Sequence, residues 1–157
     1  MQAAYPYILV IHSLLRWLVF GSVIFATFRS LRGYYWNRSY LPLDQSAADF
    51  AVRFTQIQFV LGLALYFLSP LIDYFLHNFE VALHERQARF FGMEHITMMI
   101  VAVGLISRGG AAPKRRETDK AKFKAMAIPF TLALIIILVN IPWPFSPFAA
   151  RPFFRWF

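Results

Sequence analysis

Four apolar stretches, each about as long as a bilayer is thick, limit what this chain of 157 residues can fold into. They cover residues 7–28, 54–72, 90–106 and 125–143, and the third is the shortest. At ~1.5 Å per helical residue these stretches span roughly 25–33 Å, against a hydrocarbon core of ~30 Å. Their apolar runs are continuous rather than alternating, which favours membrane-spanning helices over the strands of a closed barrel.

Composition supports the same class of protein. The chain is 59% hydrophobic and only 15% charged, so a soluble fold has too few charged residues to cover its apolar ones. The absence of cysteine excludes a disulfide scaffold, thiolate zinc sites and iron–sulfur clusters. We therefore predict an all-α, integral membrane, up-down four-helix bundle that forms a single membrane domain over residues 1–157.

The basic residues predict the orientation of this bundle. The net charge of +8 is concentrated in the segments that follow the first and third spans. The basic residues of these two segments are Arg29, Arg32, Arg38, Arg108, Lys114, Arg115, Arg116, Lys120, Lys122 and Lys124. By the positive-inside rule both segments are cytoplasmic, which puts both termini on the outer side. We expect these residues to set topology and contact anionic membrane lipid, and we expect no nucleic-acid binding.

Two segments on the outer side are not spans. Residues 75–87 (FLHNFEVALHERQ) predict an amphipathic helix on the membrane surface. On that helix His77, Glu80 and His84 share one face, which is typical of a solvated polar face rather than a metal site. Residues 144–157 are rich in Pro, Phe and Trp and predict an irregular aromatic tail, suited to the headgroup layer or to a groove on a partner subunit.

Polar residues inside the spans are the candidate functional residues, because ionisable groups are costly in hydrocarbon. The first span contains His12 and Arg16, and the third contains Glu94 and His95. In the second span, Gln58 and Tyr66 lie with Gly62 on one helical stripe, each four residues from the next.

The two histidines are predicted to lie at matching depth. Each is five residues beyond the outer start of its span, ~7 Å into the membrane. In an up-down bundle the first and third spans are diagonal, so His12 and His95 could bind the two faces of one haem b. Met99 and Phe91 would line the macrocycle, and Arg89 would pair with a propionate. Arg16 needs a partner of its own: Glu94, a propionate, or a quinone carbonyl approached through Gln58 or Tyr66.

Simpler interpretations stay open for each of these residues. A histidine in a membrane bundle is more often a hydrogen-bonding group than a ligand. Arg16, Gln58 and Tyr66 are more simply explained as interhelical contacts.

The strings HSLLRW, QFVLGLALYFLSP and RFFGMEHITMMI, together with DKAKFKAMAI and a fourth span ending in IPW, resemble small bacterial four-span cytochrome b-like integral membrane proteins. This resemblance implies a multi-pass b-haem protein of the bacterial inner membrane, with His12 and His95 at the positions of the motif histidines. Only these two histidines lie inside spans, so one haem is expected and a second bis-His haem is excluded.

From these observations we expect electron transfer between the quinone pool and a redox partner on the outer side, by a subunit of a larger complex that is not an enzyme on its own. One alternative is a haem-free accessory subunit of a membrane complex. The other is a small proton- or solute-conducting bundle, in which His12, Arg16, Glu94 and His95 form a polar relay.

Overall fold

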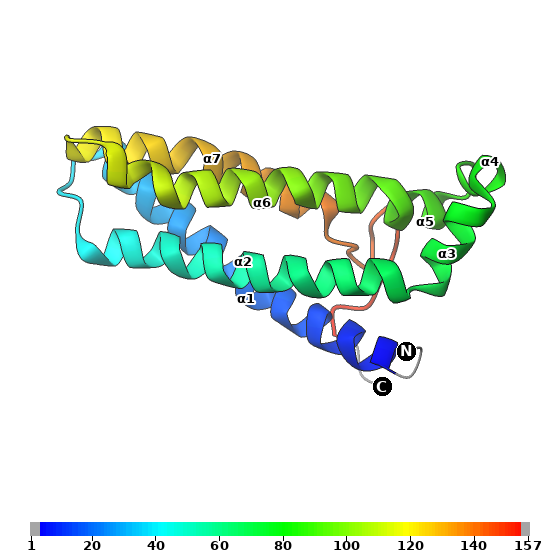
Figure 1. Ribbon diagram of the computed structural model, residues 1–157. Helices are drawn as coiled ribbons and strands as arrows, with labels where there is room; N and C mark the ends of the chain where they lie inside the picture. Colours follow the sequence, from blue (N-terminus) through cyan, green and yellow to red (C-terminus); the bar gives the residue numbers. More distant parts are fainter. Residues whose placement is uncertain (1–3, 155–157) are drawn as a thin grey trace.

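The computed structural model describes residues 4–154, which are helical except for short connections and a C-terminal segment (Figure 1). No β-strand occurs in this part of the chain. Four helical segments are long and apolar enough to cross a membrane: Tyr5–Tyr35, Pro42–Leu68, Arg86–Arg115 and Asp119–Asn140. The all-helical prediction with four potential spans is thereby confirmed.

The long helices are α1 (Tyr5–Tyr35), α2 (Pro42–Leu68), α6 (His95–Ala111) and α7 (Asp119–Asn140). Consecutive long helices run in opposite directions (Figure 1). Helix α1 packs mainly against α2 and α7, and α6 packs mainly against the same two helices. Helices α1 and α6 are therefore separated by α2 on one side and α7 on the other.

The second span ends earlier than its apolar sequence suggests. Residues 54–72 are apolar, but α2 stops at Leu68, and the short helix α3 (Pro70–His77) starts after Ser69. Proline disfavours helical geometry in the residue before it, and Ser69 is extended, with φ −78° and ψ 122°. At its other end α2 reaches back to Pro42, well before the apolar run, because the carboxylate of Asp44 accepts the Leu41 backbone N–H at 2.8 Å.

Residues 75–87 do not form the single amphipathic helix that we predicted. They are divided among α3, α4 (Phe79–Ala82) and the start of α5 (Arg86–Arg89). The chain leaves helical geometry at Asn78 and again at Glu85. These turns bring Phe75, Ala82 and Ala88 together in a small core that one straight helix could not form.

A π-helical turn, Phe90–Glu94, joins α5 to α6, and a 3₁₀ turn, Ala112–Arg115, follows α6. Together these elements make the continuous segment Arg86–Arg115.

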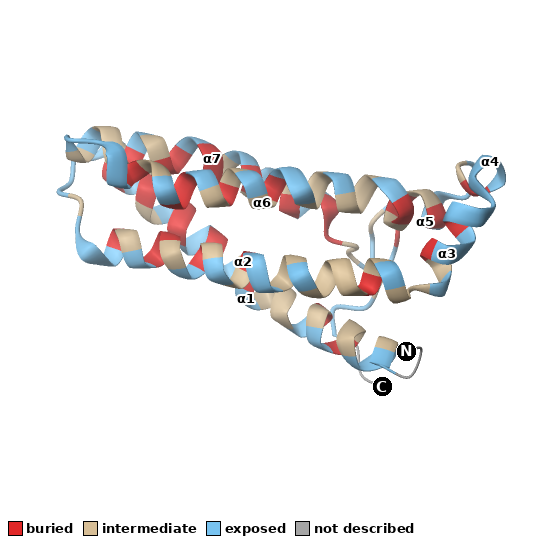
Figure 2. Ribbon diagram, in the orientation of Figure 1, coloured by how far each residue is buried: buried red, intermediate tan, exposed pale blue. Residues whose placement is uncertain are grey.

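The buried residues are concentrated near one end of the molecule (Figure 2). We call this end, where the α1–α2 loop and the α6–α7 connection lie, the basic end. Its helices are close because small side chains lie between them, with Ala48 and Ala51 fully buried. Outward-facing side chains are large and apolar; Phe67, for example, is 82% exposed, as expected of a surface that faces lipid.

Candidate functional site

The opposite end of the molecule contains a cavity of about 220 Å³ between α1, α2, α6, α7 and the C-terminal segment. We call this end the cavity end. Six of the eight residues selected from the sequence line the cavity: His12, Arg16, Gln58, Tyr66, His95 and Met99. Arg89 and Glu94 do not line it.

His95 is oriented by a backbone carbonyl. Its Nδ1 atom lies 3.1 Å from the carbonyl oxygen of Asn140. In a regular helix this carbonyl would accept the N–H of residue 144, but residue 144 is a proline and α7 ends at Asn140. When Nδ1 of His95 carries the proton, it donates to this carbonyl and leaves the Nε2 lone pair available to a ligand.

His12 lies on α1, where it contacts α2. Its own carbonyl accepts a hydrogen bond of 2.9 Å from Nε2 of Gln58, and its Nδ1 atom is enclosed without a partner. A Cβ atom at Gly62 would lie 3.3 Å from Cε1 of His12. Only a residue without a side chain therefore leaves the imidazole unobstructed at this place. His12 and His95 line the same cavity.

The π-helical turn was not predicted from the sequence. It immediately precedes His95, and the Tyr66 hydroxyl donates to the Gly92 carbonyl inside it at 3.0 Å. Such turns insert one extra residue into a helix and are frequent at functional sites. Here the turn separates neighbours in sequence: His95 lines the cavity, whereas Glu94 accepts a 2.7 Å hydrogen bond from Nε of Arg89.

Arg16 does not pair with Glu94, which was one of the three partners that the sequence suggested for it. Glu94 pairs with Arg89, and Arg16 instead donates from Nη2 to the Phe153 carbonyl at 2.8 Å. A second, longer contact of 3.5 Å joins Nη2 to the Ser13 hydroxyl. The Nε atom of Arg16 is enclosed and has no partner.

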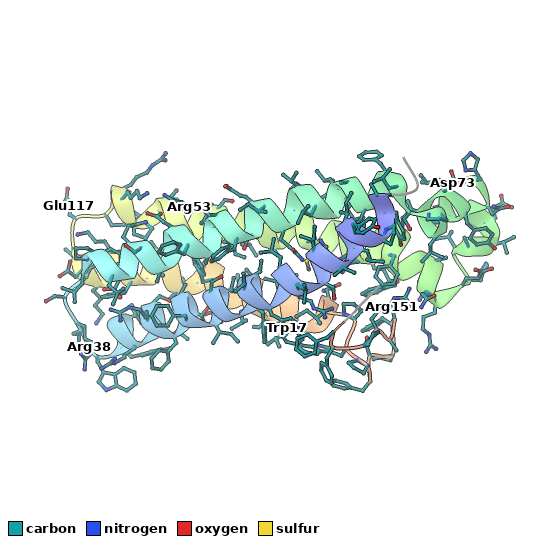
Figure 3. The ribbon with its side chains drawn as sticks, turned by 90° about the horizontal axis from the view of Figure 1, so that it is seen from below. Trp17, Arg38, Arg53, Asp73, Glu117 and Arg151 are labelled. Atoms are coloured by element: carbon teal, nitrogen blue, oxygen red, sulfur yellow. The ribbon has the colours of Figure 1, made fainter. Side chains whose placement is uncertain are left out.

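The C-terminal segment, residues 141–154, forms part of the site, which sequence reasoning missed. Helix α7 stops short of the cavity end, and this segment folds back toward α1 (Figures 1 and 3). The Phe153 carbonyl accepts from both Arg16 and the Trp17 indole, the latter at 3.2 Å. Arg151 and Pro152 line the cavity, and the Arg151 guanidinium lies 5.2 Å from the centre of the Phe91 ring. The alternation of proline with aromatic residues was the sequence signal for this contact. Proline has no backbone N–H to donate, so nearby carbonyl groups need donors from other parts of the chain.

Unpaired polar atoms are concentrated at this cavity. Among the residues described, five enclosed side-chain atoms lack a hydrogen-bond partner, and four belong to cavity-lining residues. These four are Nδ1 of His12, Nε of Arg16, Oγ1 of Thr55 and Oε1 of Gln58. Buried polar groups are nearly always satisfied in proteins, so such a concentration points to a site for a polar ligand or for water.

Residues 4–154 contain no cluster of three or more His, Asp or Glu side chains suited to a bare metal ion. His77 interacts with Asp73 instead, at 3.3 Å between Nδ1 and Oδ1.

The fold and site define a class: an all-helical protein with four potential membrane spans and a cavity lined by two histidines and two arginines. No protein-family model, curated protein or solved structure matches the chain.

Proposed function

We propose that this protein is a membrane b-type cytochrome that holds one haem between His12 and His95. In this proposal it transfers electrons between the quinone pool and a redox partner on the outer side, as a subunit of a larger complex. One observation carries the proposal: histidines from α1 and α6, helices that are not principal neighbours, line the same cavity.

The residues present fit the ligand requirements of a haem. Haem-ligating histidines are held by a hydrogen bond through the other ring nitrogen, and the Asn140 carbonyl supplies this bond to His95. Met99 and Phe91 line the cavity together with aliphatic side chains, and Gly62 leaves room beside His12. A bound haem would supply one-electron chemistry, and with histidine on both faces the iron would have no open position for a substrate.

The cavity is small for a cofactor of this kind. The volume of about 220 Å³ is below the roughly 300–1,000 Å³ usual for cofactor pockets. Binding a porphyrin therefore requires the cavity walls to separate. The wall residues without helical structure are Ser69, Ile141, Pro142, Arg151 and Pro152.

The charge distribution supports the rest of the proposal. Lysines and arginines gather at the basic end, which the positive-inside rule assigns to the cytoplasmic face of a bacterial inner membrane. Under that rule the four helices form an up-down bundle with both termini outside, the cavity lies toward the outer leaflet, and residues 141–154 are available to a partner subunit. Activity of a topology reporter fused after the last residue, on the outer side only, is the expected result.

The deciding experiment is a reduced-minus-oxidised visible spectrum of the protein purified from haem-replete cells. We expect a b-type spectrum in the wild type and in His84→Ala, whose histidine lies outside the long helices, and its loss in His12→Ala and His95→Ala. Added imidazole should partly restore the spectrum of His95→Gly if that variant folds. Absence of a Soret band from folded wild-type protein would overturn the proposal and leave the accessory-subunit alternative.

A second candidate, proton conduction, is favoured by the four unpaired polar atoms at the cavity. Waters bound to these atoms could link His12 and Arg16 in a relay. Proton flux into liposomes that contain haem-free protein, lost in His12→Ala, is the result that distinguishes this candidate from the cytochrome.

A further inference from the structure

Arg16 is a cation without an acidic partner in an apolar part of the molecule. It is 11 residues beyond the start of α1 at Tyr5, ~16 Å along a helix of 31 residues. Within residues 4–154 none of the ion pairs involves Arg16, and its two hydrogen-bond acceptors are neutral oxygens of Ser13 and Phe153. A charged group in hydrocarbon is costly unless it is paired, so we expect Arg16 to bind an anion.

The cavity around Arg16 has the same imbalance. Its described lining contains two arginines, Arg16 and Arg151, and two histidines, but no aspartate or glutamate. The nearest candidate in sequence, Glu94, is paired with Arg89. The described residues that line the cavity therefore offer no carboxylate to Arg16.

Donor groups on two walls suit a carboxylate. The Nε–H of Arg16 on α1 and the hydroxyl of Thr55 on α2 are enclosed, unpaired, and belong to residues that line the cavity. A guanidinium binds a carboxylate through two N–H groups, and a hydroxyl can donate to the same oxygens. The rest of the lining is mostly aliphatic and aromatic, so the body that carries the carboxylate should be apolar.

We propose that the cavity binds a carboxylate carried on an apolar body, with Arg16 as its cation. Two sources share this chemistry: the propionates of a haem and the head group of a long-chain fatty acid. In its haem form the inference rests on the proposed function, whereas in its fatty-acid form it does not.

The test compares acids with their esters on the full chain in detergent. One arm uses haem and haem dimethyl ester, and the other uses the fluorescent fatty acid cis-parinaric acid and its methyl ester. In wild-type protein we expect at least one acid to bind about tenfold more tightly than its ester, equivalent to about 1.4 kcal/mol. Arg16→Gln should reduce this preference to about twofold or less, and Arg16→Lys should keep most of it.

Arg53→Gln is the matched control, because Arg53 is exposed on α2, away from the cavity (Figure 3). It should leave the acid preference unchanged. Equal binding of acid and ester by the wild type in both arms would overturn the inference, even if Arg16→Gln does not fold. Haem binding without acid preference would leave the cytochrome proposal intact and overturn the carboxylate site. Fatty-acid preference without haem binding would support the carboxylate site and overturn the cytochrome proposal.

Discussion

The helices pack closely at the basic end of the molecule and enclose a cavity at the other end. At the basic end, small residues let the helices approach, so that Gly33 faces the Phe123 ring and Gly110 faces Val52. Three ion pairs of the described residues lie there, Arg29–Asp44, Lys114–Asp49 and Lys122–Asp119, and the first is the closest at 2.6 Å. At the cavity end the helices enclose about 220 Å³, and Arg16 in the wall has no acidic partner among residues 4–154.

This contrast separates stability from function. Close packing and satisfied polar groups stabilise a fold, whereas unsatisfied polar groups and cavities cost free energy. A protein keeps such costs where a ligand or a reaction needs them. Substitutions at the basic end should therefore change stability, and substitutions at the cavity end should change binding.

The largest effect is expected from Asp44→Ala at the basic end. Asp44 is 2% exposed, caps α2 and pairs with Arg29, so its loss leaves a cation and a helix terminus unsatisfied. We expect destabilisation of about 3 kcal/mol, measured by thermal or SDS-induced unfolding in detergent. The control is Asp49→Ala, which removes the more exposed Lys114–Asp49 pair and should cost about 0–1 kcal/mol. Similar losses in the two variants would show that burial of the pair does not matter.

A pair of glycines on α6 tests the close packing. A Cβ at Gly109 would meet the Phe130 ring, whereas a Cβ at Gly104 would meet nothing within 4 Å. Gly109→Ala should destabilise the protein by about 1–3 kcal/mol through overpacking. Gly104→Ala should be neutral or slightly stabilising. Equal unfolding midpoints for the two variants would contradict the close approach of α6 and α7.

Gly62→Ala tests the cavity end. Its Cβ would lie 3.3 Å from the His12 ring, so the imidazole must shift by a few tenths of an ångström. We expect haem occupancy, measured by pyridine haemochrome, to fall several-fold while the unfolding midpoint of the haem-free protein stays near that of the wild type. A large loss of stability with unchanged occupancy would place Gly62 with the structural glycines instead.

The smallest effect concerns Tyr40 in the α1–α2 loop. Burial, followed by the charges of Asp44 and Asp49, raises the pKa of Tyr40 from 10.0 to about 12. The unfolded chain releases this proton at lower pH than the folded chain does, so the associated stability is present below pH 10 and is lost as pH rises to about 12. Unfolding midpoints of wild type and Tyr40→Phe, compared between pH 9 and 11.5, should show a steeper decline in the wild type. Parallel declines would mean that the loop leaves Tyr40 open to water.

The sequence predicted the four potential spans, and six of its eight candidate residues line the cavity, but it did not predict two local features of the fold. Hydrophobic runs identified the four potential spans because continuous apolar stretches of this length are typical of membrane-spanning helices. The single surface helix over residues 75–87 was wrong, since turns at Asn78 and Glu85 bury side chains in a local core. The π-helical turn sends His95 and Glu94 to different surroundings, and no periodicity in FFGMEH indicates such a turn.

By itself, the sequence determined the all-helical class, the four potential spans and the choice of His12, Arg16 and His95 as exceptional residues, because burial of apolar surface depends on composition and period. Only the tertiary structure decided which polar groups meet. The Asn140 carbonyl reaches His95, and the Phe153 carbonyl reaches Arg16, across 45 and 137 residues of chain. Hydrogen bonds depend on distance and direction within a few tenths of an ångström, and such positions are settled only when the helices and the C-terminal segment pack together.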